Sequence, residues 1–486
     1  MRRVPALVTL AALAGCTVGP DYRPRGPAEL GVPDAYSVPA GRSAEDLTRY
    51  WGRFGDPELA RLVERARVAN TDLGQAVGRL RQAREALVQS RAALLPVVTG
   101  SAGYSRSETL RGGGTVVTRP DGTTLTLGGG GGDNFSLGLD AQYQVGLFGE
   151  VRRTVEASRA DQDAARFDYA TVLVSITSEV ARNYVLARGL QAQVANARAS
   201  LALQDDNLQI AGFRVQAGLV SSLDVEQARS QRAQTAATIP QLEQQVDAAV
   251  ARLGVLTGEA PGSLRAEMAA VRPIPLGPTE VDAGIPADVL RARPDVRAAE
   301  RSLAAATARI GVAEAQLYPA LALSGNIDTN AARLGSIART ITGGLFAGVT
   351  QAIFNGGRLR SQVRAQEAAT DTALAAYKGT VLTALEDVEN ALTAYRAAQE
   401  RQRQFGIALT AANNSAILSR SQYRSGLTDF TTLNQQELLL LSARNGLTQA
   451  QADQATALVQ LYAALGGGWS AADLPDGRPA PQTGAR

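Results

Sequence analysis

The chain has 486 residues but no histidine and only one cysteine, Cys16. These absences exclude serine–histidine and cysteine–histidine catalytic pairs, histidine metal sites, Cys/His zinc sites and a disulfide within the chain. No stretch combines paired carboxylates with the loop-rich pattern of a catalytic pocket. We therefore expect no enzyme, no metal site and no bound cofactor.

Aromatic residues and net charge are also low. Aromatics make up 5% of the chain, and the formal charge is only +3, with the arginines scattered among acids. Because nucleic-acid binding needs clustered positive charge, we expect no nucleic-acid partner. Past the first residues, no apolar run approaches the length of about 18 residues that a membrane-spanning helix needs. The recurrent alanine, leucine, glutamine and arginine favour long, closely packed helices.

The N-terminus has the pattern of a lipoprotein signal. Two arginines after Met1 precede an apolar stretch at residues 4–14, which is typical of a secretory signal. The stretch ends in Leu13-Ala14-Gly15-Cys16, which resembles a bacterial lipobox. We expect residues 1–15 to be removed and Cys16 to carry covalent lipid, palmitate included, which anchors the chain durably. The alternative is an ordinary signal peptide with an incidental cysteine.

The residue that follows the cysteine is Thr17 rather than aspartate. By resemblance to bacterial sorting rules, this favours the outer membrane over the inner one. Residues 16–50 are rich in proline and glycine, which predicts an extended, lipid-anchored tether. Residues 471–486 share this composition and are predicted to form a loose tail.

The body between these ends consists of two repeats, residues 51–270 and 271–470. Four residues of the first match four of the second at a constant offset of 223 residues (295 minus 72): Asp72, Leu80, Pro96 and Ser101 match Asp295, Leu303, Pro319 and Ser324. Further on, Gly218-Leu219 matches Gly426-Leu427 at an offset of 208 (426 minus 218). The glycine-rich segment 112–132 lies between these markers, so we expect it to be an insertion in a hairpin turn.

Two helices are predicted to be unusually long. Residues 150–211 contain no proline, and apolar residues from Leu173 to Leu201 recur in steps of three and four, like a coiled-coil seam. Residues 358–422 repeat the pattern. At 1.5 Å per residue each helix would span roughly 93 Å. Glycine-containing turns at 213–222 and 423–430 lead into return helices at 223–253 and 431–465, with Pro240 expected to kink the first.

The strands alternate strictly. From Phe135 to Leu147, apolar residues occupy every second position, and residues 321–328 do the same. This places apolar side chains on one face and polar ones on the other. Four strands cannot close a barrel, since the smallest known have about eight, and an open edge in lipid is prohibitive. We therefore expect a barrel that several chains share.

Several motifs together resemble the outer membrane factor family of TolC- and OprM-like efflux ducts, in its lipoprotein branch. The resemblance covers nearly everything from Cys16 to Trp469. The motifs that carry it are residues 290–300 (LRARPDVRAAE), 310–315 (IGVAEA), Tyr318-Pro319, Phe354-Asn355-Gly356-Gly357-Arg358, Leu147-Phe148-Gly149, residues 16–22 (CTVGPDY) and Trp51-Gly52-Arg53-Phe54. The resemblance implies a mainly α fold with a β-barrel part. It also implies a homotrimer with a twelve-stranded barrel in outer-membrane lipid and a coiled-coil tunnel through the periplasm.

The resemblance further implies the partners and the function. Such ducts join a periplasmic adaptor protein and an inner-membrane RND-type pump, and conduct small molecules, including drugs, passively. A structural lipoprotein that tethers envelope layers remains an alternative, as does a duct for metal-cation or protein export.

The resemblance places a gate just after the two turns. In the first repeat the matching acid is Asp224. The second repeat departs from the family, with Thr432 in the region where relatives often carry aspartate and Asp429 as the nearest acid. The gate is therefore expected to rest either on hydrogen bonds from Asn434 and Gln435 or on a single acidic ring. The alternative for Asp224 is a helix N-cap.

The turn residues Gly218, Leu219, Gly426 and Leu427 are expected to contact the adaptor, although ordinary turn geometry is an alternative for the glycines. Outside the turns, Arg291, Arg293 and Arg297 are expected to form a solvated helix face. Trp51 and Trp469 are expected to pack around the waist of the body rather than to bind a ligand.

Overall fold

The computed structural model describes residues 17–37, 46–108, 110, 115–127, 132–281, 284 and 286–475. The expected signal peptide, Cys16 and most of the expected tail lie outside these residues. The chain divides into two compact units. The sheet unit comprises Met1–Arg23, Ala83–Gln162 and Ser302–Leu374, and the hairpin unit comprises Pro24–Gln82, Asp163–Arg301 and Ala375–Arg486.

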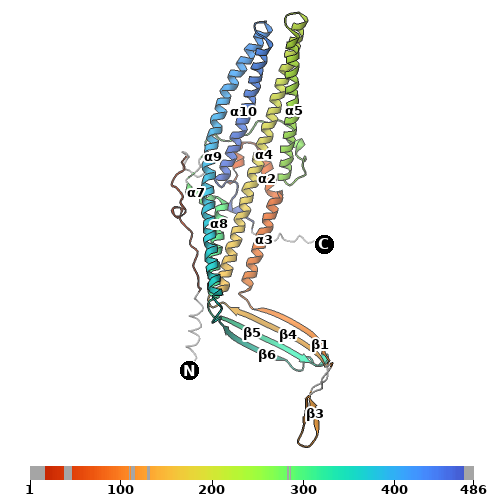
Figure 1. Cartoon of the computed structure of the whole chain (residues 1–486), viewed down its shortest axis with the longest axis vertical. Helices are drawn as coiled ribbons and strands as arrows, with labels where there is room; N and C mark the ends of the chain where they lie inside the picture. The colour runs from red at the N-terminus through yellow and green to blue at the C-terminus, as the bar shows by residue number, and fades with distance from the viewer. Residues whose placement is uncertain are drawn as a thin grey trace. The chain divides into compact units, whose positions relative to one another are not determined.

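The sheet unit is built on four antiparallel strands in the order β1-β4-β5-β6 (Figure 1). Their bounds are β1 Val97–Ser107, β4 Gly132–Val145, β5 Ala320–Ala331 and β6 Thr342–Thr350. Directly opposed residues lie on the same face of a sheet. Leu139 opposes Gly100 and Ile327, and Asp140 opposes Thr99 and Asn326. The register therefore collects the apolar residues on one face and most of the polar ones on the other, which confirms the predicted alternation.

The glycine-rich insertion has structure that the sequence did not predict. Within it, β2 (Thr115–Thr118) pairs with β3 (Thr124–Leu127) as a separate two-stranded hairpin. Its turn is closed by hydrogen bonds from the Arg119 amide to the Thr123 carbonyl and from the Gly122 amide to the Arg119 carbonyl. Gly122 has φ +83°, a left-handed conformation that glycine adopts readily. The insertion does lie in a hairpin turn, between the paired strands β1 and β4, as expected.

The helices repeat with equal lengths in the two halves. Equivalent helices of the two halves have the same number of residues. The first, α3 (Thr71–Ala92) and α8 (Pro294–Ala315), have 22 residues each. The long helices α4 (Glu150–Gln216) and α9 (Arg358–Arg424) have 67 each, and the return helices α5 (Ser222–Leu256) and α10 (Phe430–Ala464) have 35 each. This confirms the internal repeat. The two long helices run a few residues beyond their predicted ends, and α5 continues as one helix through Pro240.

Shorter elements connect these parts. They are η1 (Pro27–Leu30), η2 (Tyr50–Phe54), α2 (Pro57–Ala69), α6 (Arg265–Met268), α7 (Pro286–Ala292), η3 (Leu334–Ser336) and η4 (Ala471–Asp473).

The expectation of a solvated arginine face is wrong for two of the three arginines. Arg293 is largely buried, pairs with Asp295 at 2.6 Å and Asp387 at 2.9 Å, and donates to the Ala464 carbonyl. The Arg297 guanidinium lies 5.4 Å and 5.8 Å from the ring centroids of Phe167 and Trp469. Only Arg291 is exposed. Arg293 and Arg297 take part in packing because distant segments of the hairpin unit lie against them.

Both tryptophans are buried, as their expected packing role requires. Trp51 is 3% exposed and lies beneath the Arg67 guanidinium, 5.3 Å from its carbon to the ring centroid. Trp469 is 8% exposed, and its indole nitrogen donates to the Ala292 carbonyl at 3.0 Å.

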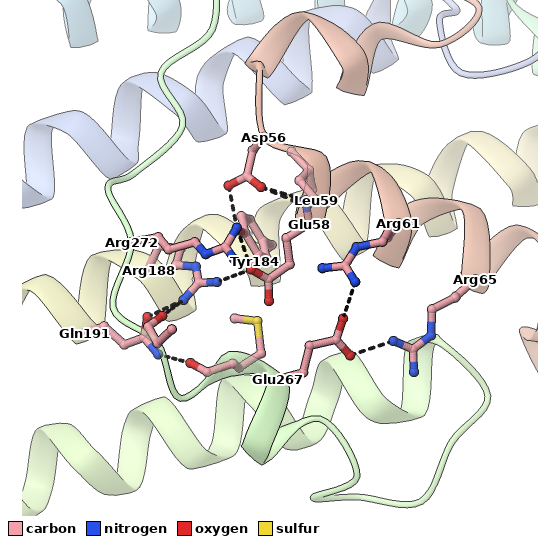
Figure 2. Close-up of polar contacts among 12 residues, drawn as sticks. Asp56, Glu58, Leu59, Arg61, Arg65, Tyr184, Arg188, Gln191, Glu267 and Arg272 are labelled. Atoms are coloured by element: carbon pink, nitrogen blue, oxygen red, sulfur yellow. Dashed lines mark hydrogen bonds and ion pairs between the residues drawn. The ribbon is translucent and has the colours of Figure 1, made fainter.

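A buried ion pair fixes α2 against α4 in the hairpin unit (Figure 2). The Arg188 Nη2 donates to Glu58 Oε2 at 2.9 Å, and both side chains are almost completely inaccessible. Arg188 also donates through Nη1 to the Gln191 side chain and to the Ala270 carbonyl. Gln191 in turn donates to the Met268 carbonyl at 2.7 Å. One guanidinium thus holds three segments that are far apart in the sequence.

Neighbouring polar contacts support this pair. Asp56 caps α2 by accepting hydrogen bonds from the amides of Glu58 and Leu59. The same carboxylate accepts a 2.6 Å hydrogen bond from the Tyr184 hydroxyl. Burial and this hydrogen bond raise the pKa of Tyr184 well above its ordinary value, so the phenol stays protonated as a donor.

Removing one member of the buried pair should destabilise the protein. We expect Glu58→Ala to cost about 3–5 kcal/mol, because it leaves the Arg188 charge buried and uncompensated. The double variant Glu58→Leu/Arg188→Met should recover most of that loss. Thermal melting in detergent measures both. Arg61→Ala is the control, since that side chain is 60% exposed and pairs with Glu267 at 3.5 Å. Equal melting temperatures for Glu58→Ala and Arg61→Ala would contradict the assignment.

Candidate functional site

The candidate site is formed by the ends of the two helical hairpins, α4/α5 and α9/α10 (Figure 1). Each turn has five residues, 217–221 and 425–429. Gly218 and Gly426 have φ +71° and +75°. The next residue in each turn donates its amide back into the preceding helix, Leu219 to the Arg214 carbonyl and Leu427 to the Gln422 carbonyl. The glycines are therefore needed for turn geometry, as the alternative interpretation proposed.

The leucines that follow these glycines have no such geometric role. Leu219 is 68% exposed and Leu427 is 79% exposed. A large apolar side chain projecting from each hairpin end is a surface suited to contact with another protein. The structure therefore leaves all four expected adaptor-contact residues accessible.

The helix caps are distributed differently from the expectation. Ser221 is the N-cap of α5 and accepts a hydrogen bond from the Leu223 amide at 3.3 Å. Asp224 lies three residues further on, so its interpretation as the cap is wrong. In the second hairpin Asp429 is the N-cap of α10, and its carboxylate accepts from the Thr432 amide at 2.7 Å. This bond and the Thr432 hydroxyl lower the pKa of Asp429.

The remaining expected gate residues lie on the first turns of α10. Asn434 is half-buried and Gln435 is exposed. At the repeat offset of 208, the counterpart of Asp224 is Thr432, which is exposed. The two hairpins therefore present different chemistry at equivalent positions.

Arg214 and Tyr423 connect the two hairpins, which the sequence analysis did not predict. Arg214, in the last turn of α4, donates to the Tyr423 carbonyl at 2.7 Å and lies over the Tyr423 ring, 4.5 Å from its centroid. Tyr423 also packs against Phe430, in a buried cluster that includes Leu433 and Ala228. Burial and the nearby Asp224 carboxylate raise the pKa of Tyr423. The only sequence feature that could have indicated this contact is position. Arg214 lies four residues before Gly218, and Tyr423 lies three residues before Gly426.

The described residues lack two kinds of feature. Within them, no helix is both long and apolar enough to cross a membrane. Nor do three or more Cys, Asp or Glu side chains come together as a possible metal site anywhere in the part of the chain that the structure describes.

Comparison with known proteins gives one consistent result. The family model for outer membrane efflux proteins matches residues 62–259 and 285–467. The pyoverdine export outer membrane protein OpmQ of Pseudomonas aeruginosa is 35% identical over 432 residues, which are 88% of this chain and 90% of that protein. The toluene efflux pump outer membrane protein TtgC of Pseudomonas putida is 30% identical over 480 residues, 95% and 94% of the two chains. The solved structure of the outer-membrane channel OprN aligns with a TM-score of 0.83 at 34% identity, covering 93% of this chain and 100% of that one.

An amphipathic four-stranded sheet in one chain with two long, matching helical hairpins defines a channel protein of the bacterial outer membrane. The chain belongs to the outer membrane efflux protein family. It is the outer-membrane duct of an efflux system, with a large helical part in the periplasm. The predicted family and fold are confirmed, and the alternative of a structural tether is wrong because the relatives are export and efflux channels.

Two substitutions distinguish the capping hydrogen bond of Asp429 from the effect of its charge. We expect Asp429→Ala to speed amide hydrogen exchange across residues 430–434, because the Thr432 amide loses its acceptor. In Asp429→Asn the exchange rate of these amides should stay close to that of the unsubstituted protein, because asparagine caps about as well as aspartate. Ser221→Ala is the matched control, with faster exchange confined to the start of α5. Faster exchange in Asp429→Asn equal to that in Asp429→Ala would show that charge, rather than the cap bond, stabilises this turn.

Proposed function

We propose that three copies of the chain form one passive exit duct, which receives small molecules from a periplasmic adaptor and an inner-membrane RND-type pump. The observation that carries the assembly is the sheet. Its strand order leaves one edge each of β1 and β6 without a partner among the described strands. Because backbone groups in lipid must be hydrogen-bonded, β6 of one copy pairs with β1 of the next.

The dimensions of the sheet suit a membrane. On the apolar face, ten residue steps separate Phe135 from Val145, or about 33 Å of strand. At the usual tilt of about 40° this gives a band about 25 Å tall, the height of a barrel's apolar belt. Aromatic pairs lie toward the two ends of the strands, Tyr104 with Phe135 and Phe148 with Tyr318. Such pairs are typical of the two membrane interfaces.

Small molecules are the proposed cargo. The relatives named above are named for pyoverdine export and for toluene efflux, so compounds of that size class are favoured over proteins. The polar face of the sheet, with Asp140, Gln142, Ser324 and Asn326, would line a wet passage. The duct carries out no chemistry, and the pump supplies both the energy and the choice of substrate.

A gate at the hairpin ends would prevent leakage. Asp224 is the proposed acidic member, because it is half-buried beside Tyr423 and its cap function is taken by Ser221. Asp429 serves α10 as a cap, so Asn434 and Gln435 are proposed to supply hydrogen bonds in the second hairpin instead of a second acidic ring. The exposed Leu219 and Leu427 are proposed to meet the adaptor, and lipid on Cys16 to anchor each copy.

The assembly is tested by mass and symmetry. Protein purified in detergent should have a protein mass about three times that of the 50.8 kDa chain, less the signal peptide. Electron-microscopy projections should show a hollow particle with threefold symmetry. A monodisperse monomer, or a solid particle, would overturn the shared barrel.

The gate is tested by conductance. We expect Asp224→Ala to raise single-channel conductance in planar bilayers and to raise sensitivity to large antibiotics, because a ring of carboxylates around the axis is lost. Glu226→Ala is the matched control, since Glu226 is an exposed acid two residues away that pairs with Arg229 on the same helix. Unchanged conductance in assembled Asp224→Ala protein would count against an acidic gate.

A further inference from the structure

Residues 17–22, which follow the expected lipid-bearing cysteine, are held against α4 and α8 inside the sheet unit. The Val18 amide donates to the Phe148 carbonyl at 3.2 Å. Thr17 lies so close to Gly149 that an added Cβ there would be 2.6 Å from the Thr17 methyl carbon. At the other end of the segment, Tyr22 packs against a cluster of three alanines, Ala160 of α4 and Ala304 and Ala305 of α8.

Arg153 is the main polar contact of this segment. Its side chain is only 5% exposed, although it lies near the start of α4. Its Nε donates to the Val18 carbonyl at 3.1 Å and its Nη2 to the Gly19 carbonyl at 2.9 Å. Nη2 also reaches Asp21 at 2.8 Å, and Nη1 reaches Glu156 at 2.8 Å. Asp21 is 82% exposed, so we attribute the attachment mainly to the two part-buried bonds to the Val18 and Gly19 carbonyls.

Two glycines let the segment approach the helices. A Cβ on Gly19, which has φ +92°, would be 2.3 Å from the Gly311 Cα. A Cβ on Gly311 would be 2.9 Å from both the Val18 carbonyl oxygen and the Arg153 Cγ. Gly19 belongs to the motif at 16–22 and Gly311 to the motif at 310–315, which are separate in the sequence. The structure joins these two motifs and Arg153 in one contact.

The contacts have the spacing of an extended chain lying along both helices. From Thr17 to Tyr22 an extended segment spans about 17 Å, and the matching contacts on α4, from Gly149 to Ala160, span about 17 Å of helix. From Gly19 to Tyr22 the segment spans about 10 Å, and Gly311 to Ala304 on α8 spans about 10 Å. The segment therefore runs parallel to α4 and antiparallel to α8, in register with both.

We propose that Arg153, Gly19 and Gly311 form a clamp that seats the acylated N-terminus beside the base of the membrane sheet, so that lipid and barrel enter the membrane at one place. This rests on the proposed lipidation of Cys16. Cys16 lies outside the described part and directly precedes Thr17 in the sequence. The stacked rings of Phe148 and Tyr318, 4.7 Å apart, adjoin the clamp at the end of the strands. Arg153 is thus a positioning residue for the lipid anchor.

The clamp has a physical consequence for the anchor. Without it, the glycine- and proline-rich residues up to about 50 would let the acyl chains settle anywhere within the reach of a flexible linker. With it, the anchor is attached to the same compact unit that carries the strands, so membrane insertion of the lipid and of the sheet support each other. The reciprocal support is an effective-concentration effect and requires no new contact with lipid.

Chymotrypsin cleavage after Tyr22 reports the clamp directly, because Tyr22 must leave its alanine cluster to be cut. Full-length protein is digested as assembled particles in detergent, and the acylated peptide 16–22 is quantified by mass spectrometry. We expect Arg153→Ala to speed release of this peptide about tenfold or more, from the loss of its charge-assisted bonds. Arg153→Lys should release the peptide at an intermediate rate, because lysine keeps the positive charge but lacks the planar set of guanidinium donors that binds both carbonyls. Gly311→Ala should act like Arg153→Ala through steric exclusion.

Arg159→Ala is the matched control, an exposed arginine on the same helix, and should leave the release rate unchanged. The melting temperature of the particle should stay within a few degrees in Arg153→Ala, which separates anchor positioning from general stability. An unchanged release rate in both Arg153→Ala and Gly311→Ala, with the acyl group present, would overturn the clamp. A peptide without acyl groups would instead overturn the lipidation of Cys16, and cleavage rates would still report on the clamp.

Discussion

Backbone amides and carbonyls inside a bilayer have no water to bind, so a strand there must be paired along both edges. This constraint determines how the rest of the molecule is used. Each chain supplies four strands, of which β4 and β5 are paired on both sides, while β1 and β6 each have one partner among the described strands. A single copy is therefore incomplete as a membrane protein. In the proposed assembly, further copies pair with the open edges, close the barrel and create its lumen.

The internal repeat makes the two hairpins of one chain nearly equivalent in length. The paired helices have 67 and 35 residues in both halves, so both hairpins can end at one level. Sequence differences at equivalent positions then supply function. The position equivalent to Asp224 in the second repeat is Thr432, which has no charge, and Asp429 caps α10. In the proposed gate, the two hairpins therefore contribute different side chains at equivalent positions.

Features that depend on local periodicity could be predicted from the sequence. The alternation in β4 and the seam of α4 determine which face is buried, so β4, β5, the long helices and the turns lie within a few residues of their predicted bounds. No residue range was predicted for β1 or β6. Features that depend on distant partners could not. Arg293 and Arg297 look like a solvated face because Asp387, Ala464 and Trp469 lie far along the chain. The β2–β3 hairpin could not be predicted because the glycine-rich segment that contains it has no clear strand pattern. Whether Ser221 or Asp224 caps α5 depends on the residue at which the helix begins.

Buried or half-buried arginines fasten the irregular segments of this protein. Arg153, Arg188, Arg214 and Arg293 each donate to a backbone carbonyl of a distant segment, at Val18, Ala270, Tyr423 and Ala464. Val18 and Ala270 lie outside helices and sheets, and Tyr423 and Ala464 lie in the last turns of α9 and α10. Carbonyls in both settings lack a regular backbone donor, and a chain with one cysteine cannot join such segments by an internal disulfide. A planar guanidinium offers five donors in a fixed fork, so one side chain can bind several carbonyls and a carboxylate together. Lysine, a flexible point charge, would not hold two carbonyls and an acid in one geometry as Arg153 does.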